Sequence, residues 1–137
     1  MFFSRFFSLV ASRFPAFVLL LAWMTVIFSF SMLSGKLTAG PPPLWYFIER
    51  KGAHVVEYAM LTILSFQYFR LTFSRESFAW VLVLSAAFSL MYGVTDELHQ
   101  FFVPLRGARM WDVGIDGIGI LLAGVLITLF QRNKNRP

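Results

Sequence analysis

Cysteine is absent from this chain of 137 residues, and acidic residues are scarce, because Asp and Glu together number only seven. Without a thiol the protein has no disulfide, no thiolate metal ligand and no cysteine nucleophile. Charged residues make up 14% of the chain, against about 25% in a typical soluble domain. These shortages exclude a disulfide-stabilised scaffold and a charged disordered tail.

Hydrophobic residues supply 58% of the chain, aromatic residues 18%, and the mean hydropathy is +0.68. A water-soluble domain of this length cannot bury so much apolar surface in one core. The composition therefore excludes a soluble enzyme and predicts a single membrane domain over residues 1–137. The net charge of +5 comes from Lys and Arg scattered between apolar stretches, with no basic face for nucleic acid.

Four apolar stretches are long enough to cross a bilayer, at about residues 14–33, 48–69, 77–95 and 112–130. They predict an all-α fold, a four-helix transmembrane bundle with short loops. Residues 1–13 carry Phe on one helical face and predict an interfacial lead-in to an uncleaved anchor. A cleaved signal peptide is the alternative for this segment.

An even number of spans places both termini on one side of the membrane. Seven basic residues fall on that side and five on the other; the seven are Arg5, Arg13, Arg70, Arg75, Arg132, Lys134 and Arg136. The bias favours a bacterial inner-membrane protein with both termini in the cytoplasm.

The acidic residues are not scattered. Six of the seven lie where the second span begins, the third ends and the fourth begins: Glu49, Glu57, Asp96, Glu97, Asp112 and Asp116. Up-and-down threading brings these three helix ends to the same membrane face, together with both histidines, His54 and His99. Because ionisable groups at membrane depth face the bundle interior and pair, we expect one polar pocket there.

Helical spacing sharpens this expectation. Lys51, His54, Glu57 and Tyr58 share one helix face, as do Asp112 and Asp116, which are four residues apart. Each residue also has a structural interpretation: His54 as a hydrogen-bonded histidine, and Asp112 as a helix cap. The functional interpretation depends on the convergence of two histidines and several carboxylates at one rim.

Three motifs in these segments resemble those of VanZ-like membrane proteins. They are KGAHVVEYAML at residues 51–61, TDELHQFFVPLR at 95–106 and DVGIDGIG at 112–119. The resemblance covers roughly residues 48–124. Two positions depart from the family pattern, since Leu105 stands where Gly is usual and Asp116 where Asn is frequent.

The resemblance implies a link to resistance against the glycopeptide teicoplanin, which acts on cell-wall precursors outside the membrane. VanZ-like proteins are also similar to a wider group of helical membrane enzymes proposed to hydrolyse or exchange lipid headgroups. This second implication is an analogy between folds.

A headgroup phosphoester needs cations for its oxygens, a base and an acid. We predict Lys51 and Arg106 as phosphate ligands, His54 with Glu57 as base or nucleophile, and His99 or Glu97 as acid. Asp96, Asp112 and Asp116 are predicted to orient these groups or hold a divalent cation, with Asp116, Tyr58 and Gln100 also placed to contact substrate. Two histidines with carboxylates suit Zn²⁺ or Mn²⁺, and carboxylates alone suit Mg²⁺, but no compact metal motif is present.

Two other functions fit the same residues. The pocket can bind a membrane lipid, a lipid-linked wall precursor or the drug without catalysis, or it can form part of a path for protons or small ions. The charges stop near one membrane face, which argues against transport, because a relay needs polar groups across the whole depth.

Overall fold

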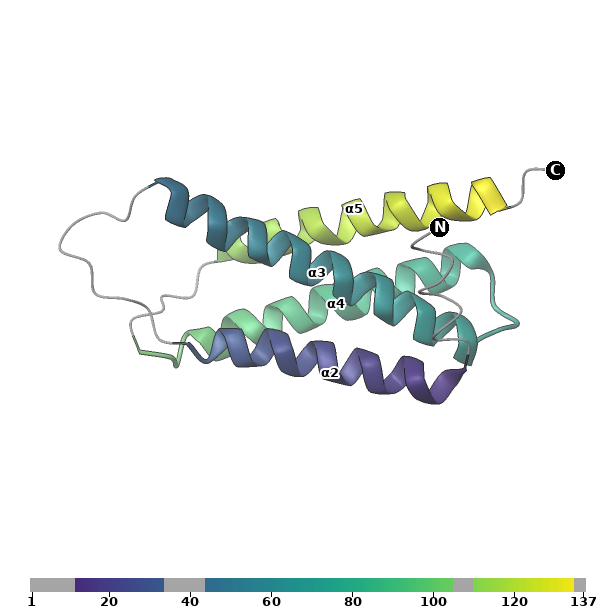
Figure 1. Ribbon diagram of the computed structural model, residues 1–137, viewed down its shortest axis with the longest axis horizontal. Coiled ribbons are helices and arrows are strands. Elements are labelled where there is room, and N and C mark those ends of the chain that lie inside the picture. Colours follow the sequence, from purple (N-terminus) through teal and green to yellow (C-terminus); the bar gives the residue numbers. More distant parts are fainter. Residues whose placement is uncertain (1–11, 34–43, 105–109, 135–137) are drawn as a thin grey trace.

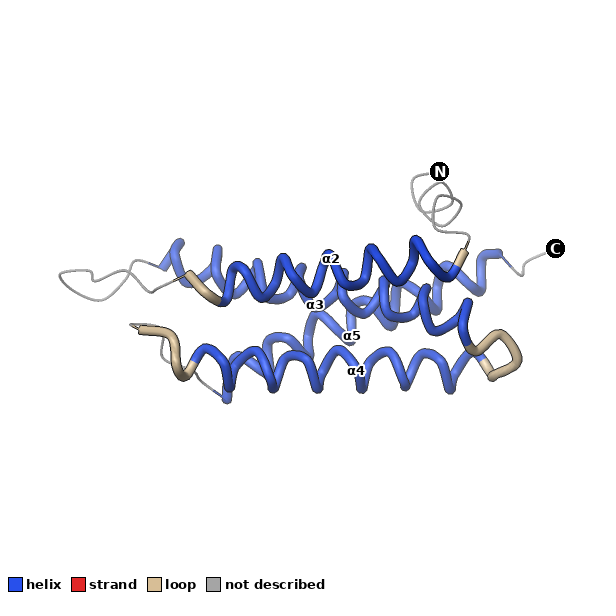
Figure 2. The backbone as a smooth tube through the Cα atoms, turned by 90° about the horizontal axis from the view of Figure 1, so that it is seen from below, coloured by secondary structure: helices blue, strands red, loops and turns tan. Residues whose placement is uncertain are grey.

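The computed structural model describes residues 12–33, 44–104 and 110–134, and within these ranges the chain forms helices and short turns without a strand. The helices are α2 (Arg13–Ser31), α3 (Leu44–Thr72), α4 (Phe78–Gln100) and α5 (Met110–Lys134). They run alternately up and down, so that α2 begins and α5 ends at the same end of the bundle (Figure 1). Figure 2 shows them side by side along one axis. The predicted all-α bundle is confirmed.

Three of the helices are long and apolar enough to cross a membrane: α2, α4 and the Trp111–Lys134 portion of α5. Most of their surface is exposed and apolar, as expected of helices that face lipid. The fourth, α3, contains the predicted span 48–69 but is less apolar than the others. Its first half carries charged or titratable side chains at Glu49, Arg50, Lys51, His54 and Glu57.

The central position belongs to α3, which packs against each of the other three helices. Tyr58, Leu61 and Leu64 of α3 form the core together with Leu20 and Ile27 of α2 and Ile120 of α5. The approach of α3 to α5 is close at Gly119, where an added Cβ would overlap the Val55 carbonyl oxygen. Glycine permits this contact because it has no Cβ.

The helix ends differ from the approximate predicted spans by one to five residues; α3 runs from Leu44 to Thr72 rather than over 48–69, and α5 ends at Lys134 rather than 130. The third helix continues past residue 95 to Gln100, and the fourth begins at Met110 rather than 112. The extension of α4 has a tertiary cause, because Asp96, Glu97 and Gln100 are buried against neighbouring helices. Residues 1–11, 34–43, 105–109 and 135–137 lie outside the described ranges. The interfacial lead-in predicted for residues 1–13 therefore lies outside them except for Ser12 and Arg13. The loop residue Arg106 also lies outside them.

Candidate functional site

Buried polar side chains gather where α2 and α4 end and α3 and α5 begin, the left end of the bundle in Figure 1. We call this group the polar site; its buried members are Ser31, His54, Asp96, Glu97, Gln100, Asp112 and Asp116. All four described helices contribute to it. Burial of so many polar groups is costly unless they are paired, and the contacts below show how they are paired.

His54 of α3 contacts Asp116 of α5, with 2.9 Å between His54 Nδ1 and Asp116 Oδ1. Both side chains are buried. A carboxylate at this position accepts a hydrogen bond from Nδ1–H of the neutral ring, and the lone pair is then on Nε2. Sequence spacing had favoured Glu57 as the carboxylate behind His54, but the residue hydrogen-bonded to Nδ1 comes from the other helix.

Lys51 and Asp112 form a second contact between the same two helices, one turn nearer the end of the bundle, as an ion pair. The side chain of Lys51 keeps 31% of its surface exposed, and that of Asp112 keeps 10%. The two contacts match because Lys51 and His54 are one turn apart on α3, as Asp112 and Asp116 are on α5. A phosphate bound by Lys51 would therefore share it with Asp112.

Asp96 joins α4 to α2. Its Oδ1 accepts a hydrogen bond from Ser31 Oγ, and its Oδ2 accepts one from Gln100 Nε2 at 2.8 Å. Gln100 Nε2 also lies 3.4 Å from Ser31 Oγ. The bond between Asp96 and Gln100 exists because α4 continues to Gln100. The predicted substrate contact Gln100 is thus engaged with Asp96 in this structure.

Tyr58 and Asp116 meet at Gly93 of α4. An added Cβ on Gly93 would lie 3.1 Å from Asp116 Oδ2 and 3.2 Å from Tyr58 Cε1. Tyr58 Oη and Asp116 Oδ2 are both buried, and neither has a hydrogen-bond partner among the described residues. These two atoms are suited to hold a further polar group, because a buried polar atom gains most from a new hydrogen bond.

The remaining predicted residues lie around these contacts. Glu97 is buried. Glu57 is partly buried, and its carbonyl oxygen accepts a bond from Trp23 Nε1 at 3.0 Å. The ring of His99 packs on Phe28 of α2 with 4.6 Å between ring centroids, and its Nδ1 has no hydrogen-bond partner within the described part of the chain.

Sequence reasoning missed Ser31 and Gly93. Ser31 lies in an apolar span with no charge, so its hydroxyl gave little signal by itself. The threading of the spans was the available clue, because it brings the end of the first span to the same face. Gly93 gave no signal, since its contribution is the space it leaves for Tyr58 and Asp116.

In the described ranges, no group of three or more His, Asp and Glu side chains is arranged to hold a metal ion. Four carboxyl groups, Asp96, Glu97, Asp112 and Asp116, are buried at the polar site. Lys51 pairs with Asp112, and His54 contacts Asp116.

Comparison with known proteins agrees with the three motifs. A family model described as VanZ/LLP1 matches residues 14–131, which is most of the chain. No curated protein and no solved structure was found to match.

Proposed function

The chain belongs to the VanZ/LLP1 family, and we propose that it is a multi-pass enzyme that cleaves or transfers the phosphoester of a lipid headgroup. The observation that carries the proposal is the contact of buried His54 with Asp116. A histidine oriented by a carboxylate is a common general base, because the carboxylate fixes its tautomer and stabilises the protonated ring.

In the hydrolytic reaction, His54 Nε2 takes a proton from a water molecule whose oxygen attacks phosphorus. The bond from phosphorus to the leaving oxygen breaks, and Glu97 or His99 supplies the proton to that oxygen. In the transfer reaction, the hydroxyl of a second headgroup replaces the water. Lys51 binds the phosphate oxygens from the open end of the site, where its side chain is partly exposed.

Asp112 and Asp96 act as positioning residues in this proposal. Asp112 holds the Lys51 ammonium until a phosphate competes for it. Asp96 ties α4 to α2 through Ser31 and so keeps the wall of the site in place. Arg106 remains a predicted phosphate ligand, and it lies outside the described residues.

The distribution of basic residues supports an orientation in the bacterial cell membrane with both termini in the cytoplasm. The terminal end of the bundle carries Arg13, Arg70, Arg75, Arg132 and Lys134, and the end with the polar site carries Arg50 and Lys51 among the described residues. The polar site then faces outward, the side of the membrane on which teicoplanin acts on cell-wall precursors. This orientation fits the link of the family to teicoplanin resistance.

A transport path for protons or small ions is less well supported than a reaction at a lipid headgroup. Thr62, Ser65 and Ser85 are buried below the polar site, but their hydroxyls donate to carbonyl oxygens of their own helices at 2.7 to 3.0 Å. Hydroxyls satisfied in this way pack helices and do not form a relay. Ser89 Oγ is also buried and has no hydrogen-bond partner among the described residues, but one hydroxyl does not supply polar groups across the whole depth.

The test is to incubate the purified protein with a panel of cell-envelope lipids and to measure headgroup release by mass spectrometry. Wild-type protein should release the headgroup of one lipid class in the panel. His54→Ala should abolish this release and retain the helical circular-dichroism signal. A control variant, Glu49→Gln, changes an exposed carboxylate on the same helix and should keep activity. Saturable lipid binding by wild type without turnover would identify a non-catalytic binder and overturn the proposal.

A further inference from the structure

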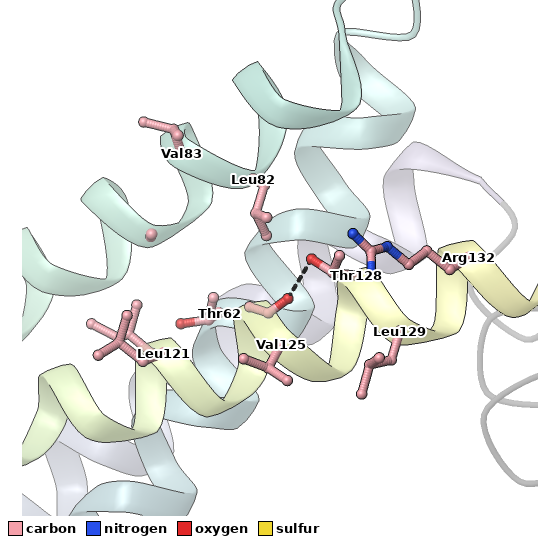
Figure 3. Close-up of a pocket in the computed structure, with 11 residues that line it drawn as sticks. Thr62, Leu82, Val83, Leu121, Val125, Thr128, Leu129 and Arg132 are labelled. Atoms are coloured by element: carbon pink, nitrogen blue, oxygen red, sulfur yellow. Dashed lines mark hydrogen bonds between the residues drawn. The ribbon is translucent and has the colours of Figure 1, made fainter.

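A groove with a cavity volume of about 430 Å³ lies on the side of the bundle between α4 and α5, with Thr62 of α3 also in its lining (Figure 3). It is separate from the polar site. Arg132 at its end and Asp116 of the polar site are sixteen residues apart on α5, about 24 Å along the helix axis. The groove begins at Ile120, about one turn past Asp116, and runs to Arg132. Since the hydrocarbon core is about 30 Å thick, its Arg132 end lies in the opposite half of the membrane.

The groove is apolar along its length. Its lining includes Leu82 and Val83 of α4 and Leu121, Val125 and Leu129 of α5, which Figure 3 labels. Val83 and Leu121 are 68% and 71% exposed, so the groove opens toward the surrounding lipid. An apolar cavity of about 150 Å³ accommodates benzene, and this larger groove has room for a long segment of an acyl chain.

Two hydroxyls in the lining do not make it polar. Thr128 Oγ1 donates to the Gly124 carbonyl oxygen, and Thr62 Oγ1 donates to the Tyr58 carbonyl oxygen, both at 2.8 Å. Each hydroxyl is thus satisfied within its own helix. A ligand in the groove needs no hydrogen-bonding groups along this part of its length.

Among the described residues that line the groove, Arg132 is the one with a charged side chain. Its guanidinium is turned back along α5 toward Thr128 (Figure 3), and it forms no ion pair with a carboxylate in the described ranges. A guanidinium binds phosphate with two parallel hydrogen bonds. An apolar groove that ends at a guanidinium is complementary to an anionic phospholipid, whose acyl tail would lie in the groove and whose phosphate would lie at Arg132.

We propose that the groove between α4 and α5 is a binding site for a single anionic phospholipid, whose acyl chain lies along Leu121 and Val125 and whose phosphate is held by Arg132. The phosphate end of the groove lies in the leaflet opposite the polar site, and the groove uses none of the residues of the polar site. The groove is open beside Gly124, because a Cβ added there would meet no atom within 4 Å.

The test measures bound lipid on the purified full-length protein in detergent by native mass spectrometry. The probes are phosphatidylglycerol and phosphatidylcholine with identical acyl chains. Wild type should retain one phosphatidylglycerol. Arg132→Gln changes an exposed side chain and should weaken phosphatidylglycerol binding about tenfold, the loss expected for one charge-assisted hydrogen bond, with little effect on phosphatidylcholine.

Gly124→Leu fills the groove and should remove the bound lipid. Gly117→Leu is the matched control, since Gly117 also has open space around it on α5 but does not line the groove. Leu121→Trp blocks the groove from its exposed rim and replaces Gly124→Leu if that variant fails to fold.

Three outcomes would overturn the proposal. They are equal binding of both lipids, unchanged phosphatidylglycerol binding in Arg132→Gln, or a dimer that Gly124→Leu converts to a monomer, which would make a second copy the occupant. His54→Ala should retain the bound lipid, so that failure of the proposed catalytic function is distinguishable from failure of this site.

Discussion

His54 and Asp116 are separated by 62 positions in the chain, yet His54 Nδ1 and Asp116 Oδ1 lie 2.9 Å apart between α3 and α5. The contact is possible because the two helices approach closely at Gly119, one turn further along α5. Backbone packing at a glycine thus fixes the geometry of the titratable pair beside it.

The first prediction concerns this pair. Asp116→Asn should lower headgroup release about 100-fold or more, because the amide no longer stabilises a protonated His54. The double variant with His54→Ala should be no slower than His54→Ala alone, since residues that act as a unit are not additive. Initial rates on one lipid substrate measure both effects. Full activity of Asp116→Asn would contradict the role given to the carboxylate.

The ion pair of Lys51 with Asp112 should contribute to stability, because it is only partly exposed to solvent. Lys51→Met should lower the free energy of unfolding by about 1–3 kcal/mol, between the values for exposed and buried pairs. Adding Asp112→Asn should recover part of this loss, because it removes the unpaired carboxylate. Thermal unfolding in one detergent provides the measurement, and Lys134→Met, at an exposed position, provides the control.

Two glycines on α5 should respond in opposite ways to alanine. In Gly119→Ala the new Cβ overlaps the Val55 carbonyl oxygen, and α3 and α5 must move apart, at a cost of about 1–3 kcal/mol. In Gly117→Ala the Cβ meets nothing within 4 Å, and the gain in helix propensity should raise stability by up to about 1 kcal/mol. Equal unfolding midpoints for the two variants would argue against the close helix packing.

Gly93→Ala should separate activity from folding. The added methyl lies 3.1 Å from Asp116 Oδ2 and 3.2 Å from Tyr58 Cε1, so both side chains must shift by a few tenths of an ångström. We expect at least a tenfold loss of headgroup release, because small displacements of catalytic groups are costly, with the protein still monodisperse in size-exclusion chromatography. Gly114→Ala, which has open space around its Cβ, should be fully active.

Ser31 should matter to stability through Asp96. Ser31→Ala removes a donor from a buried carboxylate, and we expect a loss of about 1–3 kcal/mol. Ser29 on the same helix is a matched control, because its hydroxyl is exposed and bonds the Thr25 carbonyl oxygen of its own helix at 2.7 Å. Ser29→Ala should therefore change stability by less than about 0.5 kcal/mol. Similar effects of both changes would show that the bond to Asp96 is weak.

The number and order of the helices could be predicted because each is a long run of apolar residues, and such runs are readable without tertiary information. The common location of Asp96, Asp112 and His54 at one end followed from up-and-down threading. The end of α4 could not be predicted in this way. Its last turn contains Asp96, Glu97, His99 and Gln100, and a hydropathy pattern ends where such residues begin.

Sequence spacing could not predict hydrogen-bond partners that lie on different helices. Within one helix, the interval from His54 to Glu57 suggested a pair, but the rotation of α3 against α5 decided that Nδ1 meets Asp116. Ser31 entered the site for the same reason, since only the packing of α2 on α4 brings its hydroxyl to Asp96.

By itself, the sequence determined that the chain is a helical membrane protein whose scarce acidic residues gather at one rim, because hydropathy and charge are local properties that survive in any arrangement of the helices. Tertiary structure decided which acid faces which base and where two glycines let backbones or side chains approach. It also decided that an apolar groove between α4 and α5 ends at Arg132, at the end of the bundle opposite the polar site. Those features depend on the rotation and spacing of helices far apart in the chain, which local patterns do not specify.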